Sequence, residues 1–134
     1  MTKLYAVYGA SGCGRSLMPV ARQQLARQQE PAEIVFIDDA LTEITIVNGH
    51  RAMNYPQFKA EPVSFKAVLI AIANSQVREK IALKLEQDGL PLWSVQADNT
   101  LLMDAVELGA GAALSPFVTI TSNIKIGKCF HANL

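Results

Sequence analysis

The sequence has few of the features that metal, disulfide, membrane or nucleic-acid proteins need. Its two cysteines, Cys13 and Cys129, lie in different segments and form no CxxC pair, so we expect reduced thiols with neither a disulfide framework nor a metal site. The longest apolar stretch, residues 67–73, is far shorter than the roughly 20 residues of a membrane span. Twelve basic residues balance twelve acidic ones, which argues against a nucleic-acid partner.

The first residues are also too short an apolar run for a signal peptide, so we expect a soluble, cytoplasmic protein. A chain of 134 residues, half of them apolar, has room for one domain with its own core and a short appendage.

The N-terminal part shows the pattern of a small α/β sheet. Continuous apolar runs at residues 33–37 and 66–73 are typical of strands that are buried on both faces. Further strands are expected at 3–8 and 90–95, and helices at 14–28 and 75–87, the second capped by Ser75. The order β-α-β-β-α-β predicts an open parallel sheet. Residues 41–64 are expected to be mostly irregular because of Pro56 and Pro62, with a short strand at 45–47 beside the turn pair Asn48-Gly49.

A six-residue repeat occupies the C-terminal part. Large aliphatic residues recur at Leu102, Leu108, Leu114, Ile120 and Ile126, and a second series follows each by four positions, at Val106, Ala112, Val118, Ile124 and Phe130. Helices and single strands do not have this period, whereas a β-solenoid of hexapeptides does. The alternative is an irregular amphipathic tail. We therefore divide the chain into an α/β domain at 1–99 and an incomplete hexapeptide-repeat β-helix at 100–134.

The first strand leads into Gly9-Ala10-Ser11-Gly12-Cys13-Gly14 and then into a helix. Such a turn lets backbone N–H groups approach a phosphate at the positive end of the helix. The spacing is GxxGxG, which differs from the GxGxxG of dinucleotide-binding proteins. The loop could bind phosphate, or it could be only a tight turn between strand and helix. Likewise, Arg15 could neutralise phosphate or simply be solvated.

Polar residues follow the next two strands. Asp38 and Asp39 end the second strand, where an open α/β sheet places an acidic residue against a ribose hydroxyl or a base. Asn74 and Ser75 end the third strand on the same edge and could contact sugar or phosphate. His50 and His131 have no identifiable acid or nucleophile partner, so we assign no catalytic residue.

Together, four segments resemble the bacterial hexapeptide-repeat sugar acetyltransferases that act on sialic acid or UDP-linked amino sugars, such as the N-acetyltransferase of bacillosamine synthesis. These segments are Tyr8-Gly-Ala-Ser-Gly-Cys-Gly14, Ile37-Asp-Asp39, Ile70-Ala-Ile-Ala-Asn74 with Val77-Arg-Glu-Lys-Ile81, and the hexapeptides. The chain departs from this pattern where the family often has histidine, at Cys13, and glycine, at Ala73.

The resemblance implies a Rossmann-like nucleotide-sugar-binding domain followed by the start of a left-handed β-helix. Nucleotide-sugar contacts would fall on Gly9, Ser11, Gly12, Cys13, Gly14, Arg15, Asp38, Asp39 and Asn74. In the intact enzyme the family's β-helix forms a homotrimer, binds acetyl-CoA between subunits and contributes a histidine base, with no metal.

The segment 126–134 resembles the stretch just before that histidine, so we expect this chain alone to bind a nucleotide sugar without turnover. The alternatives are an enzyme that transfers an acetyl group to nitrogen or oxygen, a non-catalytic binding module, and, less favoured by the glycine spacing, a fragment of an NAD-type oxidoreductase.

Overall fold

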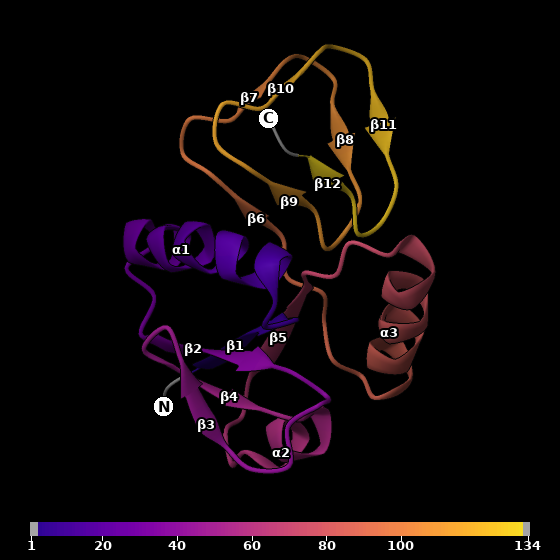
Figure 1. Ribbon diagram of the computed structural model, residues 1–134. Helices are drawn as coiled ribbons and strands as arrows, with labels where there is room; N and C mark the ends of the chain where they lie inside the picture. The colour runs from indigo at the N-terminus through magenta and orange to yellow at the C-terminus, as the bar shows by residue number, and fades with distance from the viewer. Residues whose placement is uncertain (1–2, 133–134) are drawn as a thin grey trace.

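The computed structural model describes residues 3–132 and shows a five-stranded sheet in the order β3-β4-β2-β1-β5 (Figure 1). Strands β1, β2, β4 and β5 are parallel, and β3 is antiparallel to β4. The strands are β1 (Lys3–Tyr8), β2 (Ala32–Ile37), β3 (Thr45–Val47), β4 (His50–Met53) and β5 (Lys66–Ile70). Tyr8 is paired with Ile37 on one side and with Ile70 on the other, so the carboxyl ends of three strands meet at one edge.

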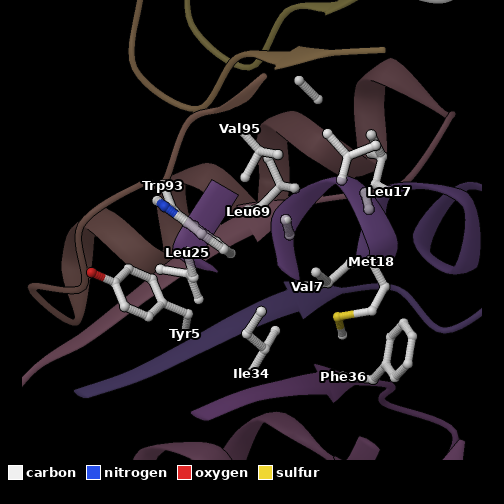
Figure 2. Close-up of a cluster of buried hydrophobic side chains, with 14 of the residues drawn as sticks. Tyr5, Val7, Leu17, Met18, Leu25, Ile34, Phe36, Leu69, Trp93 and Val95 are labelled. Carbon is white, nitrogen blue, oxygen red and sulfur yellow. The ribbon is translucent and has the colours of Figure 1, made fainter. Parts of the chain in front are cut away.

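Helices cover both faces of the sheet. Helix α1 (Gly12–Arg27) lies on one face, and α2 (Tyr55–Ala60) and α3 (Ser75–Gln87) lie on the other. Figure 2 shows the α1 face, where strand residues such as Val7 and Phe36 pack against Leu17, Met18 and Leu25 of the helix. Because alternate strand residues enter two different cores, the strands are apolar without polar alternation, as expected from the sequence.

Seven two-residue strands follow: β6 (Val95–Gln96), β7 (Leu101–Leu102), β8 (Glu107–Leu108), β9 (Ala113–Leu114), β10 (Thr119–Ile120), β11 (Lys125–Ile126) and β12 (His131–Ala132). Each pairs in parallel with the strand 18 residues away, such as Leu101 with Thr119 and Ala113 with His131. Three hexapeptides therefore make one coil, and the strands lie on three sides of it (Figure 1). We refer to the whole coiled region, residues 95–132, as the solenoid.

The solenoid has its own core. It contains both predicted apolar series except Ala112, and its members Leu114, Val118 and Ile120 are buried. The corners repeat as regularly, because a positive φ recurs every six residues at Ala105, Gly111, Phe117, Asn123 and Cys129. Four of these five residues are not glycine and adopt a costly conformation for an L-residue. The predicted α/β sheet followed by the start of a β-helix is thus confirmed.

Three local predictions were wrong. Residues 90–95 form no strand of the sheet; a single parallel bridge joins Val68 to Leu92 before the chain enters the solenoid at β6. Residues 55–60, expected to be loop, form α2, because Asn54 and Gln57 make a capping box and Pro56 lies in the first turn, where a missing N–H costs nothing. Asn74, not Ser75, is the N-cap of α3 and accepts a hydrogen bond from the Val77 N–H.

The α/β sheet and the solenoid are joined by buried polar contacts. Gln24 of α1 is 7% exposed, donates from Nε2 to the Ser94 carbonyl at 3.0 Å, and accepts from the Gln96 N–H at 2.8 Å. His131 Nε2 lies 2.7 Å from the Ile70 carbonyl oxygen at the end of β5. The first and the last strands of the solenoid are therefore both attached to the α/β part.

Two glycines at the start of α1 provide a matched stability test. A Cβ on Gly14 would lie 1.7 Å from the Gly9 carbonyl oxygen, whereas a Cβ on Gly12 would meet nothing within 4 Å. We expect Gly14→Ala to lower the free energy of unfolding by more than about 3 kcal/mol, because the backbone of the first helical turn has to move. Gly12→Ala should change it by no more than about 0.5 kcal/mol. Urea unfolding followed by circular dichroism measures both, and equal losses would contradict the close approach.

Candidate nucleotide-sugar site

The glycine loop, residues 9–14, connects the central strand β1 to α1. Gly9 has a φ of +125°, and a Cβ there would lie 2.7 Å from the Ala71 carbonyl oxygen. Its N–H donates to the Ile37 carbonyl at 2.7 Å, and the Ala71 N–H donates to the Tyr8 carbonyl at 2.9 Å. The loop is therefore fixed between the ends of β2 and β5. Positions 9 and 14 require glycine, because each lies too close to a backbone carbonyl oxygen for a side chain to fit.

The N-terminus of α1 lacks the cap that the other two described helices have. Ser11 occupies the N-cap position, but its side chain makes no capping hydrogen bond and no acidic residue lies in the first turn. In α2 and α3 the side chains of Asn54 and Asn74 supply that bond. The first intrahelical donor of α1 is the N–H of Arg15, so the N–H groups of residues 12–14 lack helical acceptors. With open space at Gly12, this helix end suits an anion.

Arg15 and Cys13 differ in what they add to the loop. The Arg15 side chain is exposed, and its Nε donates to the Ala10 carbonyl at 2.8 Å, which holds a positive charge beside the loop. Cys13 packs against the core on the α1 face. Burial raises the pKa of the Cys13 thiol, and Arg78 opposes the rise. The Cys13 side chain is thus a packing group, and its part in the loop comes from its backbone.

The two predicted carboxylates follow the end of β2 and have different partners. Phe36 packs on the α1 face and Ile37 on the α2 and α3 face. Continued past the end of β2, this alternation predicts Asp38 on the α1 side and Asp39 on the other side, and the contact of Asp39 with Tyr8 agrees with the second placement. Asp38 Oδ1 accepts from the Ala40 N–H at 3.0 Å, whereas Asp39 Oδ2 accepts from the Tyr8 hydroxyl at 2.5 Å.

The segment after β5 forms the other side of this edge. Asn74 is exposed and its Oδ1 caps α3, so only its amide nitrogen is left for a ligand. Arg78 donates from Nη1 to the carbonyl oxygens of Ile72 at 3.0 Å and Ala73 at 2.9 Å. Its Nε is buried and has no partner within residues 3–132. Arg78 belongs to a segment that resembles the acetyltransferases, but the sequence alone indicated no role for it.

Neither histidine is a free base at the glycine loop. His50 begins β4, at the opposite end of the parallel strands, and its Nε2 lies 3.1 Å from Arg22 Nη1. His131 lies near the carboxyl end of β5 but its Nε2 contacts the Ile70 carbonyl oxygen. The described part of the chain therefore holds candidate binding groups at this edge without an evident catalytic histidine.

A cavity of about 570 Å³ lies elsewhere, between α3 and the solenoid. Apolar side chains such as Leu83 and Leu92 line it, and its charges are mixed, with Arg78 and Lys128 against Glu79 and Glu86. A diphosphate needs convergent donors, which the N–H groups without helical acceptors at the start of α1 offer and this cavity does not. Among residues 3–132 no group of three or more His, Cys, Asp or Glu side chains could hold a metal ion. No helix in that range is long and apolar enough to cross a membrane.

Comparison with known families identifies the family of the domain that contains this edge of the sheet. The model of the PglD N-terminal domain matches residues 5–85, which contain the glycine loop, the acidic pair and α3. The chain belongs to the PglD N-terminal domain family. GDP-perosamine N-acetyltransferase of Escherichia coli O157:H7 is 33% identical over 132 residues, which are 98% of this chain and 59% of that protein. The resemblance to sugar acetyltransferases, as their N-terminal part, is thereby confirmed.

Solved structures agree with this family. WeeI from Acinetobacter baumannii AYE is 49% identical and superposes with a TM-score of 0.90 over 99% of this chain and 62% of its own. The acetyltransferase domain of PglB from Neisseria gonorrhoeae FA1090, in complex with acetyl coenzyme A, shares the fold, with 20% identity and a TM-score of 0.82 over 99% of this chain and 62% of that one. This PglD N-terminal domain and its solenoid thus span about three fifths of the length of these relatives.

Sequence reasoning missed the groups that hold Asp39. Lys84 of α3 donates to the Tyr8 hydroxyl at 2.8 Å, and the Tyr55 N–H donates to Asp39 Oδ1 at 3.2 Å. The sequence held one signal for Tyr8. It is a residue with a polar hydroxyl at the end of an apolar strand, directly before the glycine loop. No signal links it to Lys84, which lies 76 residues later.

The contact of His131 with β5 predicts a pH dependence of stability. Burial lowers the pKa of His131, the nearby Arg78 charge lowers it further, and the hydrogen bond to Ile70 only partly offsets this. The unfolded chain, with a histidine pKa of about 6.5, then binds more protons than the folded one, so stability is lost as pH falls below that value.

We expect His131→Gln, whose amide can still donate to the Ile70 carbonyl, to lose less stability than the unmutated chain between about pH 7.5 and about pH 5.5. Urea unfolding at each pH measures the difference. Parallel curves for the two proteins would contradict the role of His131.

Proposed function

We propose that this chain is the nucleotide-sugar-binding part of an acetyl-CoA-dependent sugar N- or O-acetyltransferase. The observation that carries the proposal is the uncapped, open N-terminus of α1 at the end of the central strand, in a chain of the PglD N-terminal domain family. The loop N–H groups would donate to the diphosphate, with Arg15 supplying positive charge. The predicted contacts at Gly9, Ser11, Gly12, Cys13, Gly14, Arg15, Asp38, Asp39 and Asn74 stay proposals.

The substrate proposed is a nucleotide-linked amino sugar. The sequence alone favoured a UDP-linked amino sugar or sialic acid, and the E. coli relative is named for GDP-perosamine, so UDP and GDP are both tested below. In the whole protein, the sugar's amine or hydroxyl would attack the thioester carbon of acetyl-CoA. A C–N or C–O bond forms, the C–S bond breaks and releases coenzyme A as its thiolate, and the proton of the amine or hydroxyl passes to a base.

The proposal extends to the architecture of the whole protein. The solenoid would continue as a left-handed β-helix that forms a homotrimer and binds acetyl-CoA between subunits. The division into an α/β domain at 1–99 and a β-helix at 100–134 is kept as a prediction, although β6 already pairs with β9. Because neither histidine of the described part is free at the glycine loop, we expect binding without acetylation by this chain.

Gly12→Val tests the phosphate site. A side chain at this open position would fill the space at the helix end, so we expect UDP or GDP affinity to fall at least about tenfold in titration calorimetry. The matched control is Gly127→Val in the solenoid, where a Cβ also meets nothing within 4 Å. It should leave the affinity unchanged.

Unchanged affinity in the Gly12 variant would remove the loop from the site.

Incubating the chain with acetyl-CoA and a UDP- or GDP-linked amino sugar tests the second candidate function, a binding module. Clear product formation by mass spectrometry would show an enzyme and contradict the expected lack of turnover.

A further inference from the structure

Both carboxylate oxygens of Asp39 already accept a hydrogen bond within the protein. Oδ2 accepts from the Tyr8 hydroxyl at 2.5 Å, Oδ1 accepts from the Tyr55 N–H at 3.2 Å, and the Lys84 ammonium lies 3.8 Å from Oδ2. These partners come from β1, α2 and α3, on the face opposite α1. Since both oxygens already have donors, Asp39 is poorly suited to accept hydrogen bonds from a ligand on the α1 side.

Lys84 is itself held in place by two aromatic rings. Its Nζ lies 4.4 Å from the centre of the Tyr55 ring and 5.2 Å from that of Tyr8, and it donates to the Tyr8 hydroxyl at 2.8 Å. Tyr8 thus accepts from Lys84 while donating to Asp39. Burial first, and then the hydrogen bond to Asp39, raise the pKa of the Tyr8 phenol well above its usual value, so it stays protonated.

This arrangement fixes geometry more than it adds stability. The side chains of Lys84 and Asp39 are 40% and 52% exposed, and ion pairs at such positions contribute little to folding. The contacts instead hold Asp39, the residue after Asp38, in one position. The backbone on either side is fixed as well, because the Asp38 N–H donates to the Met53 carbonyl at 2.8 Å and the Leu41 N–H donates to the Asp38 carbonyl at 3.1 Å.

Asp38, in contrast, keeps an oxygen available. Its Oδ1 accepts from the Ala40 N–H, and its Oδ2 has no hydrogen-bond partner within residues 3–132. Strand alternation turns Asp38 toward the α1 side, and its neighbour Ile37 accepts the N–H of Gly9 in the glycine loop. A ligand whose diphosphate lies at the start of α1 would therefore have its nucleoside within reach of Asp38 and not of Asp39.

We propose that Asp38 is the carboxylate that accepts hydrogen bonds from the nucleoside, and that Tyr8, Asp39 and Lys84 form a positioning cluster that holds Asp38 in place. This inference rests on the proposed nucleotide-sugar function and deepens it. It replaces two equivalent acidic ligands with one binding residue and one positioning residue. The donor on the nucleoside is a ribose hydroxyl or a base N–H.

The test measures affinity for three ligands by calorimetry. They are the nucleoside diphosphate that the unmutated chain binds more tightly, UDP or GDP, its 2′-deoxy counterpart, and pyrophosphate, which has no nucleoside. We expect Asp38→Asn to weaken the nucleotide at least about tenfold and to leave pyrophosphate unchanged. The asparagine keeps the oxygen that accepts from Ala40, so the turn is preserved. A loss that is absent with the deoxy ligand identifies the ribose 2′-hydroxyl as the donor, and an equal loss assigns the donor to the 3′-hydroxyl or the base; both support Asp38.

The positioning cluster is tested with Tyr8→Phe, Asp39→Asn and Lys84→Met. Each should weaken the nucleotide about threefold without changing pyrophosphate binding, and none should have a further effect in the Asp38→Asn background. The matched control is Tyr55→Phe, which loses the hydroxyl bonded to Asp88 but keeps the ring beside Lys84 and the N–H that binds Asp39. It should bind like the unmutated chain. A purely structural role would weaken nucleotide and pyrophosphate alike.

The outcomes separate this inference from the proposed function. If the unmutated chain binds none of the three ligands, the nucleotide-sugar function fails. If it binds the nucleotide but Asp39→Asn causes the larger loss while Asp38→Asn causes none, the assignment of the two carboxylates is overturned. Additive effects of Tyr8→Phe and Asp38→Asn would overturn the positioning cluster.

Discussion

The close contact between the first turn of α1 and the end of β1 is the constraint on which the rest of the structure depends. Gly14 lies against the Gly9 carbonyl, and Gly9 in turn lies against the Ala71 carbonyl, at distances that exclude a side chain. This contact places the N-terminus of α1 directly over the end of the central strand. The ends of β2 and β5 are hydrogen-bonded to the same turn, so the acidic pair and the segment after β5 are located relative to it.

Helix α1 also connects that edge to the solenoid. Its first turn belongs to the glycine loop. Three helical turns later, Gln24 donates a hydrogen bond to the carbonyl of Ser94, just before β6, and accepts one from the N–H of Gln96 in β6. His131 makes a second connection, from β12 to the end of β5. A buried amide that loses its partners carries a desolvation cost, so the solenoid is held in one orientation relative to the loop. In the acetyltransferase proposed above, that orientation would determine where the acetyl donor meets the sugar.

The sequence predicted those parts of the fold that follow from periodicity. Aliphatic residues from Leu102 to Phe130 recur at six-residue intervals because each side of the coil is one hexapeptide, and buried strands were evident because both of their faces are covered. The sequence prediction missed α2 because this segment contains proline. The capping box of Asn54 and Gln57 makes the segment helical. At the candidate site, the glycine loop and Asp38 could be proposed from local order, whereas the contact of Tyr8 with Lys84 joins residues 76 apart and required the tertiary structure.

Backbone donors at the glycine loop can hold a diphosphate but cannot distinguish one nucleotide sugar from another, since every such ligand presents the same phosphate oxygens. Discrimination therefore has to come from side chains on either side of the loop. On one side lies Asp38, and on the other the segment at 72–75, whose carbonyls at Ile72 and Ala73 are held by Arg78. Because Arg78 belongs to α3 and also acts electrostatically on His131 of the solenoid, the proposed sugar end of the site would be held by a residue that is electrostatically linked to the solenoid rather than by the loop itself.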